Sequence, residues 1–336
     1  MTTTDYFYEQ RWYFYIIGLL IVLLLVAQPA TAFSGSGAGT GGDPYQITSL
    51  AKWSEIASAP SAAYILNNDL DFSGASYAGL DCTFTGVLNG NNKTIRNMVS
   101  PYAETGSITG NYVTGIFPSV DGGTVKNIYI TNLSLTASGS SAYNCIGGIA
   151  GETRGATFQY IMIDSSDLTT SLTGSSTFDV GGISGYEYTT SVFDHCIVIA
   201  EVYSGGNVRS VGGMVGWNGG GETYCFAALT PSGTLPVSAH GMNGNIAGAP
   251  SNCYYDYTVF GTHDETGATK LTTAQCGVKS NFATWDGSWF LISSGYPAWM
   301  SYFPAPVASF TKDQTSIKAG DSTVSFTDTS SNTPTS

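Results

Sequence analysis

The central part of the chain alternates short apolar stretches with glycine-rich polar gaps, and this pattern repeats. The clearest copies of the gap motif are Ile146-Gly147-Gly148-Ile149-Ala150-Gly151, Val180-Gly181-Gly182-Ile183-Ser184-Gly185 and Val211-Gly212-Gly213-Met214-Val215-Gly216, after a weaker Val113-Thr114-Gly115-Ile116-Phe117. The marker glycines Gly115, Gly148, Gly182 and Gly213 are separated by 33, 34 and 31 residues. A β-rich stretch follows each copy, over residues 125–130, 158–163, 193–199 and 223–228.

A period of about 30 residues with β-branched and aromatic strands is typical of a β-solenoid. We therefore predict an all-β chain folded as a parallel β-helix, in which equivalent side chains of neighbouring coils stack about 4.8 Å apart. Glycines fit turns that need a positive φ or a close backbone approach. Aligning the stretches places an inward ladder at Ile128, Ile161, Cys196, Cys225 and Cys253. An antiparallel sandwich is the alternative, but it does not explain the recurring glycine motif.

The composition agrees with stacked coils. Only 10% of the 336 residues are charged, against about 25% in a typical domain. Neutral Gly, Thr, Ser and Asn stack without the repulsion that identical charges suffer. The formal net charge of −13 argues against a nucleic-acid partner, which requires clustered Lys and Arg.

The first 32 residues have a different pattern. Trp12 to Val26 form an uninterrupted apolar run after Arg11, and the small residues Ala30 and Ala32 precede Phe33. This order predicts a secretory signal peptide over residues 1–32, with an uncleaved N-terminal anchor as the alternative. We expect an extracellular or cell-surface protein, which meets a membrane only through an uncleaved leader or a part beyond residue 336.

Export changes the interpretation of the cysteines. The chain has six, Cys82, Cys145, Cys196, Cys225, Cys253 and Cys276, without a Cys-x-x-Cys pair or Cys/His cluster that would indicate zinc. Stacked thiols are the expectation, and one disulfide is the alternative. Two Asn-x-Ser/Thr triplets make Asn92 and Asn132 candidate glycosylation sites, although two triplets are also expected by chance in so polar a chain.

Together, these motifs resemble the GLUG-motif repeats of bacterial and archaeal surface proteins. The flanking motifs are similar as well: residues 41–47 and 84–91 on one side, and residues 252–256, 271–273, 285–286 and 295–297 on the other. The resemblance covers roughly residues 40 to 300. It implies a solenoid domain over residues 33–303 of a protein located at the cell surface.

Both ends of the predicted solenoid need covers, because open coils expose strand edges and apolar core. Thr48 or Ser49 can cap a short helix that carries Leu50, Trp53 and Ile56. We expect residues 281–300, which are rich in aromatic side chains, to cover the other end, with a sugar-stacking platform as the alternative. Residues 304–336 resemble the start of a PKD domain, an Ig-like β-sandwich that is incomplete here.

The sequence offers few candidates for catalysis. His195 precedes the ladder cysteine Cys196, so the two side chains should point in opposite directions and not form a nucleophile pair. The acidic candidates, which include Asp179, Glu201 and Glu222, lie at differing positions of the repeat, and we interpret them as a solvated acidic surface. Among the acidic residues, Asp164, Asp167 and Asp194 are our candidate surface acids. We expect no cofactor; calcium would suit the many oxygen ligands, but no calcium-loop motif is present.

We therefore expect a non-enzymatic surface protein, an adhesion module or stalk that binds an unidentified glycan or surface protein. The alternatives are a carbohydrate-active enzyme on one solenoid face and a purely structural envelope component. An enzyme should show two carboxylates about 5 to 9.5 Å apart in a concave site. If aromatic side chains flank such a pair, the adhesion hypothesis fails.

Overall fold

The computed structural model describes residues 33–75, 79–100, 112–137, 143–171, 177–205, 208–217, 219–233, 236, 238–245, 248–261, 267–299, 310–312 and 326–328. The expected leader, residues 1–32, lies outside the described residues. Within them, no helix is long and apolar enough to cross a membrane.

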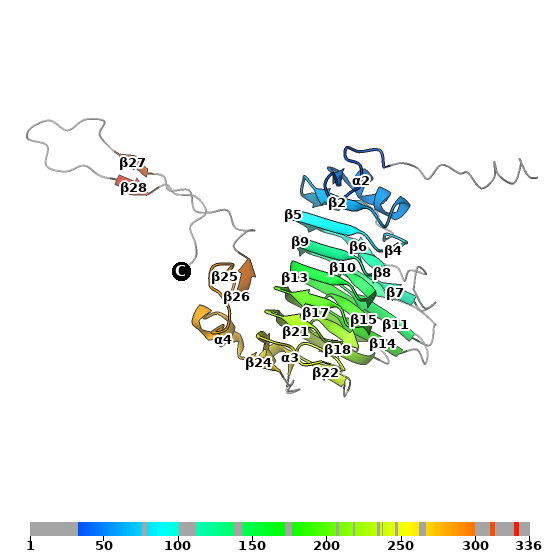
Figure 1. Ribbon diagram of the computed structural model, residues 1–336. Coiled ribbons are helices and arrows are strands. Elements are labelled where there is room, and N and C mark those ends of the chain that lie inside the picture. The colour runs from blue at the N-terminus through cyan, green and yellow to red at the C-terminus, as the bar shows by residue number, and fades with distance from the viewer. Residues whose placement is uncertain are drawn as a thin grey trace, which may run out of the picture.

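Three parallel sheets form the body of the molecule, and the coils stack along one axis (Figure 1). The long sheet follows the order β1 (Tyr45–Ile47), β2 (Ala63–Leu66), β5 (Val87–Arg96), β9 (Thr124–Thr131), β13 (Thr157–Ser171), β17 (Ile197–Gly205), β21 (Phe226–Gly233), β23 (Cys253–Asp256) and β24 (Ala268–Leu271). Its side branches are β3 (Leu70–Asp71), β6 (Val99–Ser100), β10 (Ser134–Ala137), β16 (Val192–Asp194) and β20 (Glu222–Thr223).

Two short sheets complete each coil. The first short sheet has the order β22 (Ser238–His240), β18 (Val208–Gly212), β14 (Thr177–Gly181), β11 (Tyr143–Gly147) and β7 (Tyr112–Thr114). The second short sheet has the order β19 (Val215–Trp217), β15 (Ser184–Thr189), β12 (Ala150–Arg154), β8 (Phe117–Asp121) and β4 (Thr83–Phe84). Their strands pair in parallel, so the predicted β-solenoid is confirmed and the antiparallel sandwich is wrong.

The glycine motif forms the tight turn between the two short sheets. A Cβ atom on Gly148 would lie 2.4 Å from the carbonyl oxygen of Gly182, and one on Gly182 would lie 2.1 Å from that of Gly213. At Gly115 an added Cβ would lie 2.9 Å from the backbone of Ala150. None of these marker glycines has a positive φ, so close backbone approach is the reason for glycine here. Gly241 continues the stack one coil further, at a copy that the sequence alignment lacks.

The sequence-derived ladder lies inside the solenoid. Ile128 and Ile161 are register partners, and Cys196, Cys225 and Cys253 continue the row. All five are at most 1% exposed and belong to one core cluster that runs the length of the coils.

A short helix covers the N-terminal end of the solenoid (Figure 1), which confirms the predicted capping helix. Helix α2 (Leu50–Ser54) and the 3-10 turn η1 (Glu55–Ser58) follow Ser49, whose side chain accepts a hydrogen bond from the Lys52 backbone N–H. Trp53 and Ile56 are fully buried in the main core. The apolar spacing of this segment therefore seals the first coil.

The C-terminal aromatic segment packs against the flank of the solenoid and not against its end, which corrects our expectation. The segment comprises α4 (Thr273–Cys276), the 3-10 turn η2 (Lys279–Asn281), and the antiparallel pair β25 (Phe290–Ser293) and β26 (Tyr296–Trp299). It forms a second core with outward-facing side chains of successive coils: Met162, Ile197, Phe226 and Tyr254. The segment packs on the flank because these outward apolar side chains form a hydrophobic surface there, against which its own aromatic side chains are buried.

The last coil is closed by other residues. Helix α3 (Tyr257–Phe260) begins at Asp256, whose side chain accepts from the backbone N–H groups of Thr258 and Val259. Phe260 is 2% exposed and belongs to the main core, and β24 pairs with β23 as the final strand.

Of the tail that resembles a PKD domain, the structure describes one antiparallel pair, β27 (Phe310–Lys312) with β28 (Phe326–Asp328). The remainder of residues 304–336 lies outside the described residues, and the PKD resemblance stays a prediction.

Candidate functional site

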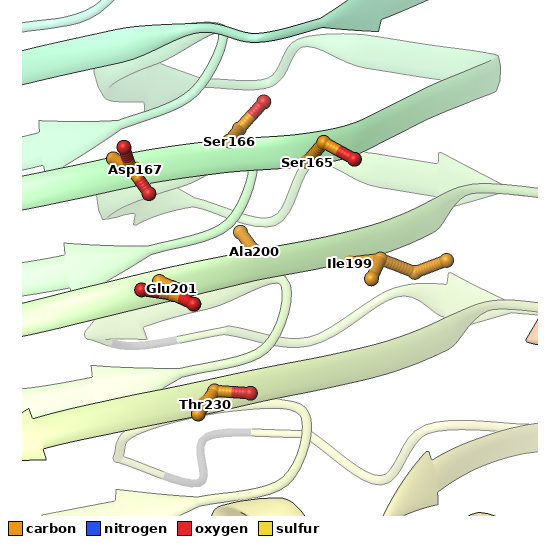
Figure 2. Close-up of a pocket in the computed structure, with 7 residues that line it drawn as sticks. All are labelled: Ser165, Ser166, Asp167, Ile199, Ala200, Glu201 and Thr230. Carbon is orange, nitrogen blue, oxygen red and sulfur yellow. The ribbon is translucent and has the colours of Figure 1, made fainter.

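A shallow pocket lies on the outer face of the long sheet, where β13, β17 and β21 run side by side (Figure 2). Its volume is about 330 Å³, and its lining residues are Ser165, Ser166, Asp167, Ile199, Ala200, Glu201 and Thr230. Asp167, Glu201 and Thr230 are register partners on neighbouring strands. Their side chains are therefore adjacent members of one outward row, with a rung spacing of about 4.8 Å.

A one-residue mismatch between two coils creates this depression. Ile163 pairs with Val198 and Ser166 pairs with Ala200, so β13 has two residues where β17 has only Ile199. The extra residue, Ser165, adopts a left-handed φ of 51°. Such a bulge bends one strand away from the next and opens the surface beside it.

The bulge is held by local hydrogen bonds. The buried Ser166 hydroxyl donates to the carbonyl oxygen of Asp164 at 3.1 Å and accepts from the Leu133 backbone N–H at 3.3 Å. Asp164 itself accepts from the Tyr129 hydroxyl at 3.1 Å and from Ser165. Asp164 thus supports the rim of the pocket without lining it.

Asp167 and Glu201 are exposed and share the pocket floor with hydroxyl and aliphatic groups. No aromatic or basic side chain is among the lining residues. Two adjacent carboxylates repel each other when no cation or donor lies between them. Chemically, the arrangement can accept hydrogen bonds from a hydroxyl-rich ligand or attract a cation.

Asp194 lies elsewhere, on β16, where it pairs with Gln159 near the start of β13. Its carboxylate is 2.7 Å from Nδ1 of His195. His195 stacks between Tyr160 and Tyr224, with ring centroids 4.8 and 4.9 Å away, and meets the edge of Trp289 at 4.8 Å. The three surface acids of the sequence analysis therefore do not converge on one site.

The cysteine side chains point away from this histidine. The Cys196 thiol donates to the carbonyl oxygen of Phe158 at 3.5 Å, and the Cys225 thiol donates to that of Phe193 at 3.4 Å. All six cysteines are described, buried and unbridged. Burial raises the pKa of Cys82 and of Cys276 to about 12, and it raises the pKa values of Cys145, Cys225 and Cys253 well above the ordinary value. Thiols in this state are poor nucleophiles.

Two further carboxyl groups, those of Glu187 and Glu222, are sealed inside the solenoid and are at most 1% exposed. Burial raises the pKa of Glu187 to about 8, the Ser191 backbone N–H opposes the rise, and the charge of Glu222 adds to it. Burial also raises the pKa of Glu222. A perturbed carboxyl group often marks an active site, but these two are closed off from substrate.

Within the described part of the chain, no group of three or more His, Cys, Asp or Glu side chains could hold a metal ion. Of the two candidate glycosylation sites, Asn92 is exposed within β5, at the register shift against β9, with φ of 56°. The Asn132 side chain donates to Oδ1 of Asn97 at 3.1 Å and is thereby part of an asparagine ladder.

Asp167 and Glu201 are acidic candidates from the sequence, whereas the sequence does not single out their neighbours in the pocket, Ser165, Ser166, Ile199 and Thr230. The available signal was the one-residue difference in length between the β13 and β17 stretches. A periodic alignment absorbs such a difference as a gap, so it does not reveal the bulge.

No family model matches this chain, and no curated protein matches it. Among solved structures, a protein from Bacteroides ovatus, described as a candidate immunoglobulin A1 protease, is similar, with a TM-score of 0.51 and 15% sequence identity. The match covers 79% of this chain and 94% of that chain. At this identity the likeness concerns the fold alone, and it shows that the chain folds as a parallel β-solenoid.

Proposed function

We propose that the chain is a non-catalytic binding module of an extracellular surface protein, with a glycan or a surface protein as its partner. One observation carries the proposal: the carboxylate pair of the pocket, Asp167 and Glu201, is exposed in a shallow depression without aromatic or basic neighbours among the lining residues. Catalysis by paired carboxylates normally uses a desolvated acid in a site that encloses the substrate.

The architecture supports the same function. Stacked coils present long, regular outer faces, and extended faces are what repeat proteins use to bind partners. The apolar run before Phe33 and the resemblance to GLUG-motif proteins support export to the cell surface.

One observation favours the alternative, a carbohydrate-active enzyme. Asp167 and Glu201 lie on neighbouring rungs, and a rung spacing of about 4.8 Å is close to the separation of about 5 to 5.5 Å used by retaining glycosidases. This hypothesis predicts that either carboxylate is indispensable for bond cleavage.

Two measurements test the proposal. An array of glycans and surface proteins shows what the chain binds, and a reducing-end assay shows whether the bound glycans are cleaved. We expect the chain to bind at least one glycan or protein class without releasing new reducing ends. If the chain cleaves a glycan, and if the Asp167→Asn and Glu201→Gln variants do not, the chain is a carbohydrate-active enzyme instead. Absence of all binding would leave a purely structural role.

A further inference from the structure

A second surface feature lies where the two short sheets meet: its aromatic and arginine side chains come from β12, β15 and β19 of the second short sheet and from β18 of the first. The arginine–aromatic patch consists of Arg154, Tyr186, Tyr188, Arg209 and Trp217. Tyr186 and Trp217 are register partners on β15 and β19, and the Tyr186 and Tyr188 rings lie 4.5 Å apart. All three aromatic side chains are half-buried, so each keeps part of its ring accessible.

The two tyrosines share one side of β15. Because side chains alternate along a strand, Tyr186 and Tyr188, which are two residues apart, point the same way. Thr153 pairs with Glu187 and Arg154 pairs with Thr189, so Tyr188 is an extra residue of β15 in the register with β12. The adjacent Glu187 remains buried inside.

Arg209 is held over the patch by a buried carboxylate. Its Nε donates to Asp179 Oδ1 at 2.9 Å, and its Nη2 donates to Oδ2 of the same carboxylate. The Ser210 hydroxyl donates to Asp179 Oδ1 at 2.6 Å, and the Asp179 side chain is only 2% exposed. The guanidinium lies 3.8 Å from the Trp217 ring centroid and 5.8 Å from that of Tyr186. These contacts fix both the arginine and the indole before any ligand arrives.

Arg154 occupies the other side of the patch. Its guanidinium lies 5.7 Å from the Tyr188 ring centroid and 3.8 Å from the Asp121 carboxylate, and its side chain is 41% exposed. The Arg154 guanidinium carries five N–H donors, more than the Asp121 carboxylate beside it can accept.

The charges of the patch decide between ligand classes. Each guanidinium already lies beside a carboxylate, Asp179 or Asp121, so the patch carries no surplus positive charge. The chain as a whole carries −13. An anionic polymer would be repelled at long range and would meet arginines that are already neutralised. A neutral sugar pays no such cost: its ring stacks on aromatic faces, and its hydroxyls accept hydrogen bonds from the Arg154 guanidinium.

We propose that the arginine–aromatic patch is a binding site for a neutral polysaccharide, with Trp217, Tyr186 and Tyr188 as the stacking surface, Arg154 as a hydrogen-bond donor and Arg209 as the group that holds the indole in place. The inference rests on the proposed function as a binding module and names its ligand class and site. The site is distinct from the pocket at Asp167 and Glu201.

Affinity electrophoresis of the whole chain in gels that contain laminarin, mannan or dextran tests the proposal, with polygalacturonate as the acidic probe. We expect retardation by at least one neutral polysaccharide and none by polygalacturonate. Trp217→Ala and Tyr188→Ala should each weaken the dissociation constant at least tenfold. Arg209→Lys should weaken it as well, because lysine keeps the charge but loses the planar stacking contact.

Val278→Ala, on an exposed surface away from both the patch and the pocket, is the matched control and should bind like the unmodified chain. The melting temperature of each variant is measured to show that it is folded. If Trp217→Ala does not fold, Tyr188→Ala is used in its place.

Each contrary outcome has a separate meaning. Binding that depends on Glu201 and not on the patch, or binding to polygalacturonate alone, overturns the inference and leaves the binding module intact. Retention of surface proteins without any polysaccharide overturns the inference in the same way. Cleavage of the polysaccharide overturns the proposed function as well.

Discussion

At the scale of single residues, two different constraints operate at the corners of the coil. The marker glycines are required by close approach: an added Cβ on Gly182 would lie 2.1 Å from a carbonyl oxygen of the next coil. The opposite corner uses left-handed residues with side chains. Tyr160, His195 and Tyr224 have φ values of 53° to 55° and stack outside the ladder. At the marker positions, glycine is thus required because a neighbouring coil leaves no room for a Cβ atom, and not because the backbone is left-handed.

Gly182→Ala should therefore destabilise the fold strongly. The new methyl group meets backbone, which cannot move without breaking the ladder between coils, and overpacking of this kind costs about 3 kcal/mol or more. Gly41→Ala, where no atom lies within 4 Å of the added Cβ, is the control. Thermal denaturation should show a much lower melting temperature for Gly182→Ala only, and equal melting temperatures would refute close approach as the constraint.

The buried Glu187 makes stability depend on pH. The folded chain holds its proton up to about pH 8, whereas the unfolded chain releases it near the ordinary pKa of 4.5. The folded state therefore binds more protons between these values, and stability falls as the pH rises through this window.

Replacing Glu187 by Gln should flatten this dependence. One such group contributes a slope of about 1.4 kcal/mol per pH unit, and an amide does not titrate. Urea denaturation at pH 5, 6 and 7 measures the free energy of unfolding, with the exposed Glu201→Gln as the control. The buried-acid account fails if Glu187→Gln and the unmodified chain show the same slope.

At the scale of elements, the C-terminal segment is a flank-packed unit with its own small core. Trp299 lies over Tyr160, Trp289 over His195, and Phe282 over Phe226 and Tyr254. The Trp285 indole N–H also donates to the carbonyl oxygen of Asn252 at 2.7 Å. These contacts tie the hairpin β25–β26 to successive coils of the long sheet.

Phe282→Ala should loosen this segment before it affects the solenoid. Phe282 is 2% exposed, and removing a buried phenyl group costs about 3 to 5 kcal/mol, whereas Val278 is 47% exposed and serves as the control. Hydrogen exchange should show faster exchange of the β25 and β26 amides with little change in β13. Equal exchange in Phe282→Ala and Val278→Ala would contradict a flank-packed core.

At the scale of the whole molecule, the repeat made the architecture predictable. Strand pairing in a solenoid follows directly from the alignment of one coil with the next, so Ile128, Ile161 and the three ladder cysteines could be placed from sequence. The pocket could not, because it depends on one extra residue, Ser165. The arginine–aromatic patch could not, because it brings Arg209 of the first short sheet against Trp217 of the second. The position of residues 273–299 was missed because it depends on outward apolar residues that the repeat does not single out.

The central claim is that the whole chain binds its partner without changing it. The most direct measurement incubates the chain with a bound neutral polysaccharide and determines the size distribution of the recovered polymer by mass. The account predicts a retained polymer of unchanged length, and loss of retention in Trp217→Ala but not in Val278→Ala. Shortened chains that disappear in Glu201→Gln would contradict it.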